Sequence, residues 1–198
     1  VEGTLNVLES AKNLNLKQVI VTSTSEVYGT AIKKKLSEND ELKAQSPYAA
    51  SKIAADQLSL SYYRSFDLPV KIVRPFNTYG PRQSARAIIP TVFSQLLAGK
   101  EEIHLGNLSP TRDLTFVKDT AKGFYEISKS DKAIGKAINI GMNSEITIGE
   151  LVKLIGKVTG NTDFEIISEV ERVRPQRSEV ERLFCDNTFI KKYTGWRP

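Results

Sequence analysis

The sequence predicts an α/β fold in which helices cover both faces of a parallel sheet, with a smaller α/β lobe beside it. Two stretches that resemble strands, residues 17–24 and VKIVRPF from Val70, are apolar on both faces. This is typical of strands buried between two layers of helices. Helical patterns alternate with these strands, which favours parallel pairing. Beyond Asn77 the elements become short and mixed, as in a small second lobe.

The first helix is expected at the amino end, where five apolar residues recur with helical spacing: Leu5, Val7, Leu8, Ala11 and Leu14. Residues 17–24 then form a buried strand. A polar, turn-rich stretch over residues 30–46 precedes a second helix, which Pro47 opens and Leu68–Pro69 ends. The strand from Val70 completes a strand, helix, strand unit.

The second half predicts the elements of the small lobe. Helices are expected near residues 88–98, 118–128 and 148–158, and Thr147 is placed to cap the last one. Short strands are expected in EEIHL, LTFV, AINIG and FEIIS. A dinucleotide-binding sheet carries a Gly-rich turn after its first strand, and this sequence has no such fingerprint. Either the fold binds no dinucleotide, or its first half is missing.

Composition narrows the class of protein. With 198 residues, 40% of them hydrophobic, the chain can bury a substantial core. Its one cysteine, Cys185, cannot form an internal disulfide; it fits a reducing cytoplasm and the role of a small filler near a strand end. No apolar run approaches the roughly 20 residues that cross a bilayer, and the amino end lacks an export signal. We therefore expect a cytoplasmic protein without a membrane partner.

The charge pattern does not favour a nucleic-acid partner. A net charge of +5 suits an acidic ligand, but it is equally typical of a solvated surface. The lysines are scattered, and no basic helix alternates with aromatic residues.

The sequence has no cluster of His or Cys residues, so it predicts no metal site. The one histidine, His104, should face away from its neighbour Leu105 and be structural.

The strongest chemical signal is Tyr48-Ala-Ala-Ser-Lys52. Residues four apart lie on one face of a helix, so this spacing places a phenol beside an ammonium group. A nearby cation favours the phenolate, which can then take a proton from a sugar hydroxyl as hydride leaves for a nicotinamide. The same spacing also occurs in ordinary surface pairs.

A second signal, Thr24-Ser25-Glu26, follows directly after the first strand. In open α/β sheets, catalytic groups gather at the carboxyl ends of strands. If the backbone stays extended, Thr24 and Glu26 point the same way and place a hydroxyl and a carboxylate in one crevice. The alternative is that Glu26 simply faces water at the start of a loop.

Several segments together resemble a known family. They are GTLNVLESAK, TSTSEVYG, SPYAASKIAAD, VRPFNTYGPR, TRDLTFVKDTAKG, INIG and GWRP, in this order. The chain is similar throughout to the epimerase/dehydratase branch of the extended short-chain dehydrogenases. This resemblance implies a doubly wound Rossmann-type sheet that binds NAD, with its amino-terminal part missing. Residues 1–80 would be the carboxyl-terminal part of that domain. Residues 81–198 would mainly form the nucleotide-sugar lobe, with some segments returning to the sheet.

The resemblance also implies the roles of the candidate catalytic residues. Glu26 resembles the base that takes the C5 proton in 4,6-dehydratases of nucleoside-diphosphate sugars. Thr24 would bind the C4 oxygen, Tyr48 would take its proton, and Lys52 would hold the nicotinamide ribose. Ser23 and Pro75 would complete the cofactor contacts.

Ser25 stands where thymidine-diphosphate-glucose dehydratases carry the Asp that acts as acid, so Glu26 would serve as both base and acid. The Thr-Ser-Glu sequence is similar to that of guanosine-diphosphate-mannose dehydratases and some uridine-diphosphate-N-acetylglucosamine dehydratases. It also resembles that of nucleotide-glucuronate decarboxylases. A decarboxylase, a 4-epimerase and an inactive fragment that only binds nucleotide sugar or pairs with another subunit are therefore alternatives.

The resemblance extends to the substrate contacts and to assembly. The expected substrate residues are Arg112, Asn77, Arg174 and Arg82 for polar contacts, Ile88 and Leu105 for the walls of the nucleotide slot, and Asn139 as a further polar contact. Family members commonly pair their first two helices with those of a second subunit. Because Leu58, Leu60, Tyr62 and Tyr63 make the second helix apolar on more than one face, we expect a homodimer, unless that face covers the small lobe.

Overall fold

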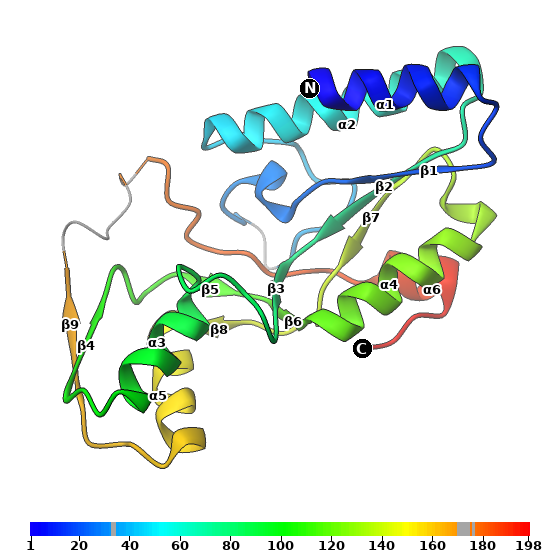
Figure 1. Ribbon diagram of the computed structural model, residues 1–198. Coiled ribbons are helices and arrows are strands. Elements are labelled where there is room, and N and C mark those ends of the chain that lie inside the picture. Colours follow the sequence, from blue (N-terminus) through cyan, green and yellow to red (C-terminus); the bar gives the residue numbers. More distant parts are fainter. Residues whose placement is uncertain (33–34, 170–174, 176) are drawn as a thin grey trace.

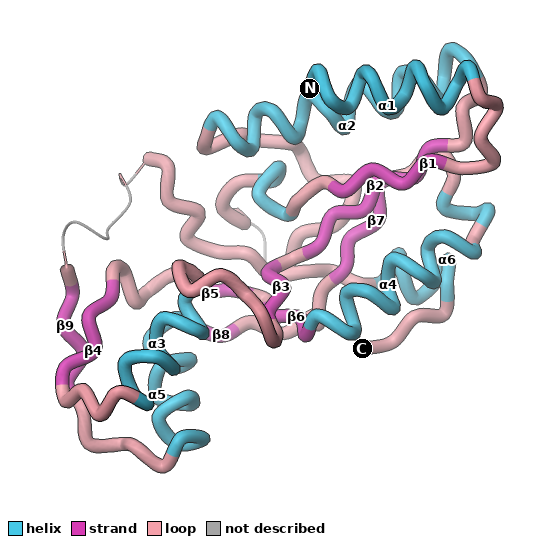
Figure 2. The backbone as a smooth tube through the Cα atoms, in the orientation of Figure 1, coloured by secondary structure: helices cyan, strands magenta, loops and turns pink. Residues whose placement is uncertain are grey.

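The structure is a computed structural model that describes residues 1–32, 35–169, 175 and 177–198. It consists of a main sheet with helices on both faces and a smaller lobe beside it (Figure 1). Figure 2 shows the strands of the main sheet running side by side beneath two long helices. The expected α/β fold with parallel strands is confirmed.

The main sheet has the strand order β1-β2-β7, and both pairings are parallel. Its strands are β1 Val19–Thr22, β2 Val70–Pro75 and β7 Ala137–Ile140. The first five positions of β2 are buried, because a central strand is covered on both faces. The segment AINIG, which the sequence pattern placed in the small lobe, therefore belongs to this sheet. The proposed boundary at residue 80 stays a prediction.

Helices cover the two faces of this sheet. On one face lie α1 (Glu2–Asn13) and α2 (Pro47–Phe66), and on the other lie α4 (Val117–Lys129) and α6 (Thr188–Thr194) (Figure 1). Adjacent residues of β2 point to opposite faces: Ile72 packs in the core with α1 and α2, whereas Val73 packs in the core with α4 and α6. The two buried cores make this part a doubly wound, Rossmann-type layer structure.

The small lobe has its own core. Helices α3 (Ile88–Leu97) and α5 (Ile148–Thr159) pack together, and β4 (Glu102–Leu105) pairs in parallel with β9 (Glu165–Ser168). Its fully buried residues include Val92, Ile103 and Val152. Two short pairings lie between the lobe and the main sheet. They are the parallel pair β3 (Asn77–Tyr79) with β6 (Leu114–Phe116) and the antiparallel pair β5 (Thr111–Arg112) with β8 (Ile146–Thr147).

Local sequence signals explain how the helices begin and end. The Ser46 side chain accepts a hydrogen bond from the Ala49 backbone N–H at 3.1 Å, so Ser46 is the N-cap of α2 and Pro47 its first residue. Thr147 and Glu150 form a reciprocal capping box at α5, which confirms the predicted cap. Two short 3-10 helices, η1 (Ser25–Tyr28) and η2 (Asp131–Ala133), were not predicted. None of the helices in the described residues is long and apolar enough to span a membrane.

The apolar pattern of the first two helices is only partly explained by this core. In α1, Leu8 and Ala11 are buried, but Leu5 and Val7 are exposed, as is Leu14 at the C-cap. In α2, the four apolar residues pack against the core formed by α1, β1 and β2: Leu58, Leu60, Tyr62 and Tyr63. The alternative that they cover the small lobe is therefore wrong. They lie over the sheet because α2 runs along its face.

Candidate active site

The Thr-Ser-Glu segment lies at the carboxyl end of β1, in a tight turn. Thr24 is still extended, but Ser25 begins the helix η1, and the Thr24 Oγ1 accepts a hydrogen bond from the Glu26 N–H at 3.2 Å. The premise of an extended backbone from Thr24 to Glu26 is therefore wrong, because Thr24 caps a 3-10 turn. Ser25 is buried, with 3% of its surface exposed, whereas Thr24 and Glu26 are partly exposed.

The Tyr48 pair lies at the start of α2 and is anchored to the same strand end. Lys52 Nζ donates to the Thr22 carbonyl, the last residue of β1, at 3.0 Å. Tyr48 lies one turn earlier on the helix, and 49% of its surface is exposed. Helix η1 also packs against α2. The structure therefore brings the two candidate segments together at one edge of the sheet, with the Tyr48 phenol open to solvent.

The expected cofactor contacts Ser23 and Pro75 end two adjacent strands. Ser23 follows β1 and donates its backbone N–H to the Val73 carbonyl at 2.7 Å. Pro75 is the last residue of β2 and is partly buried. Because β1 and β2 are parallel neighbours, both residues lie at the carboxyl edge of the sheet. This is where doubly wound folds bind their ligands.

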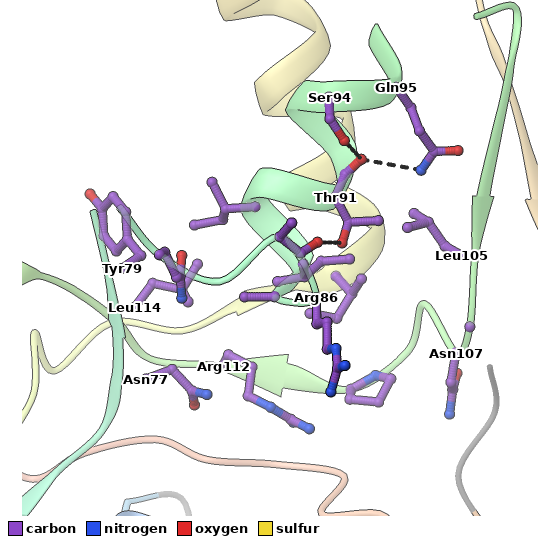
Figure 3. A pocket seen from close by; sticks show the side chains of 18 of the residues that line it. Asn77, Tyr79, Arg86, Thr91, Ser94, Gln95, Leu105, Asn107, Arg112 and Leu114 are labelled. Atoms are coloured by element: carbon purple, nitrogen blue, oxygen red, sulfur yellow. Dashed lines mark hydrogen bonds between the residues drawn. The ribbon is translucent and has the colours of Figure 1, made fainter. Parts of the chain in front are cut away.

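A cavity of about 760 Å³ is lined mainly by the small lobe and reaches Asn77, which lies two residues beyond the end of β2. Four of the predicted substrate residues line it: Asn77, Ile88, Leu105 and Arg112. In Figure 3, the polar ends of Asn77, Arg86 and Arg112 point toward the same open side of the cavity. The cavity has the size of a small-molecule site.

Arg112 is already paired with a carboxylate. Its Nη2 lies 3.0 Å from Glu179 Oε1, and its Nη1 donates to the Thr111 carbonyl at 2.9 Å.

The next residue, Asp113, is fully buried and accepts backbone N–H bonds from Met142, Asn143, Ser144 and Cys185. Burial raises the pKa of Asp113 to about 6, although these N–H groups oppose the rise. Asp113 thus ties the strand that carries Arg112 to two neighbouring loops.

Two of the other predicted substrate residues, Arg82 and Asn139, are not among the described residues that line this cavity, and the third is not described. Arg82 is exposed, in a loop with a φ of 66°, outside the cavity wall. Arg174 lies outside the described residues. The prediction for Asn139 is wrong, because its side chain is fully buried and bonds to Tyr28 and the Leu36 carbonyl. A polar residue at a strand end can form hydrogen bonds inside the protein as readily as it can bind a ligand.

Several cavity residues were missed in the sequence. The cations Arg86 and Lys100 line the wall together with Asn107, Gln83 and Glu179. Arg86 belongs to the arginine-bearing loop before α3, but no spacing distinguishes it from an ordinary surface arginine.

His104 and Cys185 remain structural: His104 Nδ1 lies 2.9 Å from Glu169 Oε1, and the Cys185 thiol is buried. Burial raises the pKa of that thiol, which keeps it protonated.

The fold and the site define a Rossmann-type α/β protein with a Tyr and a Lys one helical turn apart at the ligand-binding edge of its sheet. Residues 1–198 match the family described as GDP-mannose 4,6 dehydratase. The chain therefore belongs to the NAD-dependent epimerase/dehydratase family.

Individual relatives include both dehydratases and epimerases. The chain is 31% identical over 198 residues to dTDP-glucose 4,6-dehydratase of Streptomyces griseus, covering 100% of the chain and 59% of that protein. It is 33% identical over 202 residues to UDP-glucose 4-epimerase of Mycolicibacterium smegmatis, covering 100% and 63%. The crystal structure of dTDP-glucose 4,6-dehydratase from Bacillus anthracis in complex with NAD superposes with a TM-score of 0.89 and 30% identity, covering 100% and 62%. The chain thus spans about 60% of the length of these relatives.

Proposed function

We propose that the protein dehydrates a nucleoside-diphosphate hexose to its 4-keto-6-deoxy form. The observation that carries this proposal is the packing of η1, which bears Glu26, against the helix that bears Tyr48 and Lys52. A hexose at this edge could meet an acid-base pair for C4 and a separate carboxylate for C5. Family membership supports a nucleotide-sugar substrate, and the neighbouring cavity has room for one.

NAD is the proposed cofactor. The carboxyl ends of β1 and β2 fit it, because Ser23 and Pro75 end there and Lys52 is held at the end of β1 through Thr22. Lys52 and Tyr48 would contact the nicotinamide ribose. When bound, NAD supplies the chemistry of accepting hydride from C4 and returning it to C6.

The side chains of this chain would move the protons. Tyr48 takes the C4 hydroxyl proton, which the nearby Lys52 ammonium favours, while Thr24 holds the C4 oxygen. Glu26 then takes the C5 proton, which the new ketone has made acidic, and gives it to the C6 hydroxyl, which leaves as water. To complete the 4-keto-6-deoxy sugar, C5 regains a proton, which balances the one that Tyr48 took. Because Ser25 is buried, it is a poor candidate for a direct part in catalysis. Glu26 is therefore the proposed acid as well as the base.

The diphosphate and nucleoside are assigned to the cavity. Arg112 and Arg86 are cations on its wall, and arginine forks suit phosphate oxygens. Asn77 would add a polar contact at the end nearest the sheet, while Ile88 and Leu105 would pack against the nucleoside. Arg82 remains a proposed contact although it does not line this cavity. Arg174 also remains a proposed contact, and it lies outside the described residues.

The test is the Glu26→Gln variant of the full-length protein, given uridine, thymidine and guanosine diphosphate sugars. Oxidation at C4 should persist, as seen in nicotinamide absorbance, because Tyr48 and Lys52 are intact. The 4-keto-6-deoxy product should fall by about 10²- to 10⁴-fold, because the C5 proton has lost its base. Glu101→Gln, an exposed carboxylate in the small lobe, is the matched control and should keep wild-type activity.

Unchanged product formation in the Glu26→Gln variant would refute the dehydratase proposal. Two further outcomes identify the alternatives. A C4 epimer as the only product would indicate a 4-epimerase, which the relatives favour as second candidate. Carbon dioxide released from a nucleoside-diphosphate glucuronate would indicate a decarboxylase. Purified 198-residue chain without nicotinamide absorbance would indicate that this piece alone does not hold NAD.

We also propose a homodimer formed through α1 and α2. Val7 on one face of α1 and Leu14, the C-cap residue that follows the helix, have 56% and 70% of their surfaces exposed. This face points away from the sheet, whereas Leu8 and Ala11 pack inward. Exposed apolar residues gathered on one helix face suit a second copy of the same face.

A further inference from the structure

A buried charged pair joins the helix of Tyr48 to the central strand of the sheet. Arg74 on β2 directs both Nε and Nη2 to Asp56 Oδ2 on α2, each at 3.0 Å. Asp56 is completely buried, and Arg74 is 3% exposed. Asp56 lies one helical turn after Lys52, and Arg74 immediately precedes Pro75. Neither residue lines the cavity of about 760 Å³.

The same arginine continues to the segment that carries Glu26. Arg74 Nη1 donates to the Tyr28 hydroxyl at 2.8 Å, and that hydroxyl donates to Asn139 Oδ1 at 2.8 Å. Tyr28 is the last residue of η1, two positions after Glu26. Arg74 and Asn139 are paired neighbours on β2 and β7. A continuous hydrogen-bonded chain thus runs from α2 through two strands to η1.

Burial fixes the direction of these bonds. Desolvation raises the pKa of Tyr28 to about 12, so its hydroxyl keeps its proton and always donates to Asn139. The Asn139 backbone N–H in turn donates to Glu38 at 2.8 Å. A buried ion pair adds little net stability, since desolvation offsets much of its attraction. It does hold its partners in one geometry, because leaving either group unpaired costs far more.

We infer that Asp56, Arg74 and Tyr28 form a positioning link that sets the Glu26 turn against the Tyr48 helix. This inference rests on the proposed roles of Glu26 and Tyr48. The Asp56 end fixes α2 to β2, and the Tyr28 end fixes η1 to the same arginine. The link acts on catalysis only through the residues that it positions. Its loss should therefore affect the step served by Glu26 more than the step served by Tyr48.

The experiment is Tyr28→Phe in the full-length protein, which removes one hydroxyl and keeps the ring. Elimination to the 4-keto-6-deoxy sugar should slow by about 10- to 100-fold, because a small displacement of a catalytic group has costs of this size. Oxidation at C4 should change by less than about threefold, because α2 keeps its Asp56–Arg74 anchor. Tyr62→Phe is the matched control: it removes a hydroxyl on α2 that bonds to Glu9, far from η1, and should leave both steps unchanged.

A second readout does not depend on activity. Amide hydrogen exchange over residues 24–29 should rise in Tyr28→Phe relative to wild type, and remain at the wild-type level in Tyr62→Phe. Unchanged exchange in that segment, or equal slowing of both steps with a matching loss of melting temperature, would overturn the link. A wild-type protein that converts none of the sugars would instead refute the proposed function, and the exchange result would still decide the link.

Discussion

Glu38 shows how one partly buried residue can set the response of this protein to pH. Its Oε1 accepts the Asn139 backbone N–H at the end of the polar network. Desolvation raises its pKa from about 4.5 to about 7, and the nearby Asp186 adds to the rise while Asn139 and Arg74 oppose it. The folded protein therefore keeps a proton on Glu38 that the unfolded chain releases.

This raised pKa predicts a loss of stability with rising pH. The contribution of Glu38 is fully present below about pH 4.5 and is lost as the pH rises through about 7, where the folded state must also ionise it. Glu38→Gln keeps the acceptor oxygen but cannot ionise. Between pH 5 and pH 8, wild type should lose on the order of 2 kcal/mol more free energy of unfolding than the variant.

Urea unfolding of both proteins at the two pH values measures this difference. Glu41→Gln, a substitution in the same loop at a carboxylate outside the buried network, is the control and should follow wild type. Parallel pH dependences of wild type and Glu38→Gln would show that the Glu38 carboxyl does not titrate in this window.

Single residues were predictable where spacing restricted their position. The four-residue separation of Tyr48 and Lys52 fixes one helix face, and the position of Thr24 after an apolar strand fixes a sheet edge. Asn139 was assigned to a ligand, but it is bonded inside the protein. The burial of Asp56 and Arg74 could not be predicted, because nothing in the sequence distinguishes a charged residue that is paired in the core from one that faces water.

At the scale of elements, the start of α2 controls where Tyr48 lies. The Ser46 hydroxyl accepts the Ala49 N–H, so it satisfies one of the first backbone donors of the helix. Tyr48 is the second residue of this helix, within the turn that the cap holds. A frayed first turn would move the phenol before it affected Lys52.

Ser46→Ala should therefore reduce both stability and turnover. The lost cap is worth about 1 kcal/mol of the free energy of unfolding. The C4 oxidation rate should fall by more than the change in folded fraction explains, because the first turn bears Tyr48. Ser46→Asp restores the acceptor and should restore both quantities, as measured by urea unfolding and nicotinamide absorbance. A lower rate in Ser46→Asp equal to that of Ser46→Ala would rule out the cap as the cause.

The longer elements were predicted well, because periodicity and end signals reinforce each other over many residues. Helix α2 begins at Pro47 as expected, α5 begins directly after its predicted cap Thr147, and β2 begins at Val70 as expected. The 3-10 turn η1 was missed, since four residues carry too little pattern to separate it from an extended chain. The pairings β3 with β6 and β5 with β8 join short strands from distant segments. They depend on tertiary packing that local sequence does not encode.

At the scale of the whole molecule, the exposed face of α1 predicts how two copies meet. Val7→Glu places a charge in the centre of the proposed dimer contact, and burying an unpaired carboxylate there is unfavourable. The variant should be monomeric in sedimentation equilibrium at concentrations where wild type is dimeric. Val158→Glu is the matched control, because Val158 is 72% exposed on α5 of the small lobe and should not alter assembly. A Val7→Glu dimer as tight as wild type would place the contact elsewhere.

The ion pair between Arg112 and Glu179 affects how strongly the proposed site would bind anions of different charge. Both side chains are mostly buried, so the arginine is already neutralised before any ligand arrives. An incoming anion gains only the difference between its own attraction to the guanidinium and that of the carboxylate it replaces. Singly charged metabolites gain almost nothing from such an exchange, whereas a diphosphate with more charge and more oxygens gains on both counts. If Arg112 contacts the substrate as proposed, its pairing with Glu179 would favour a diphosphate over singly charged anions.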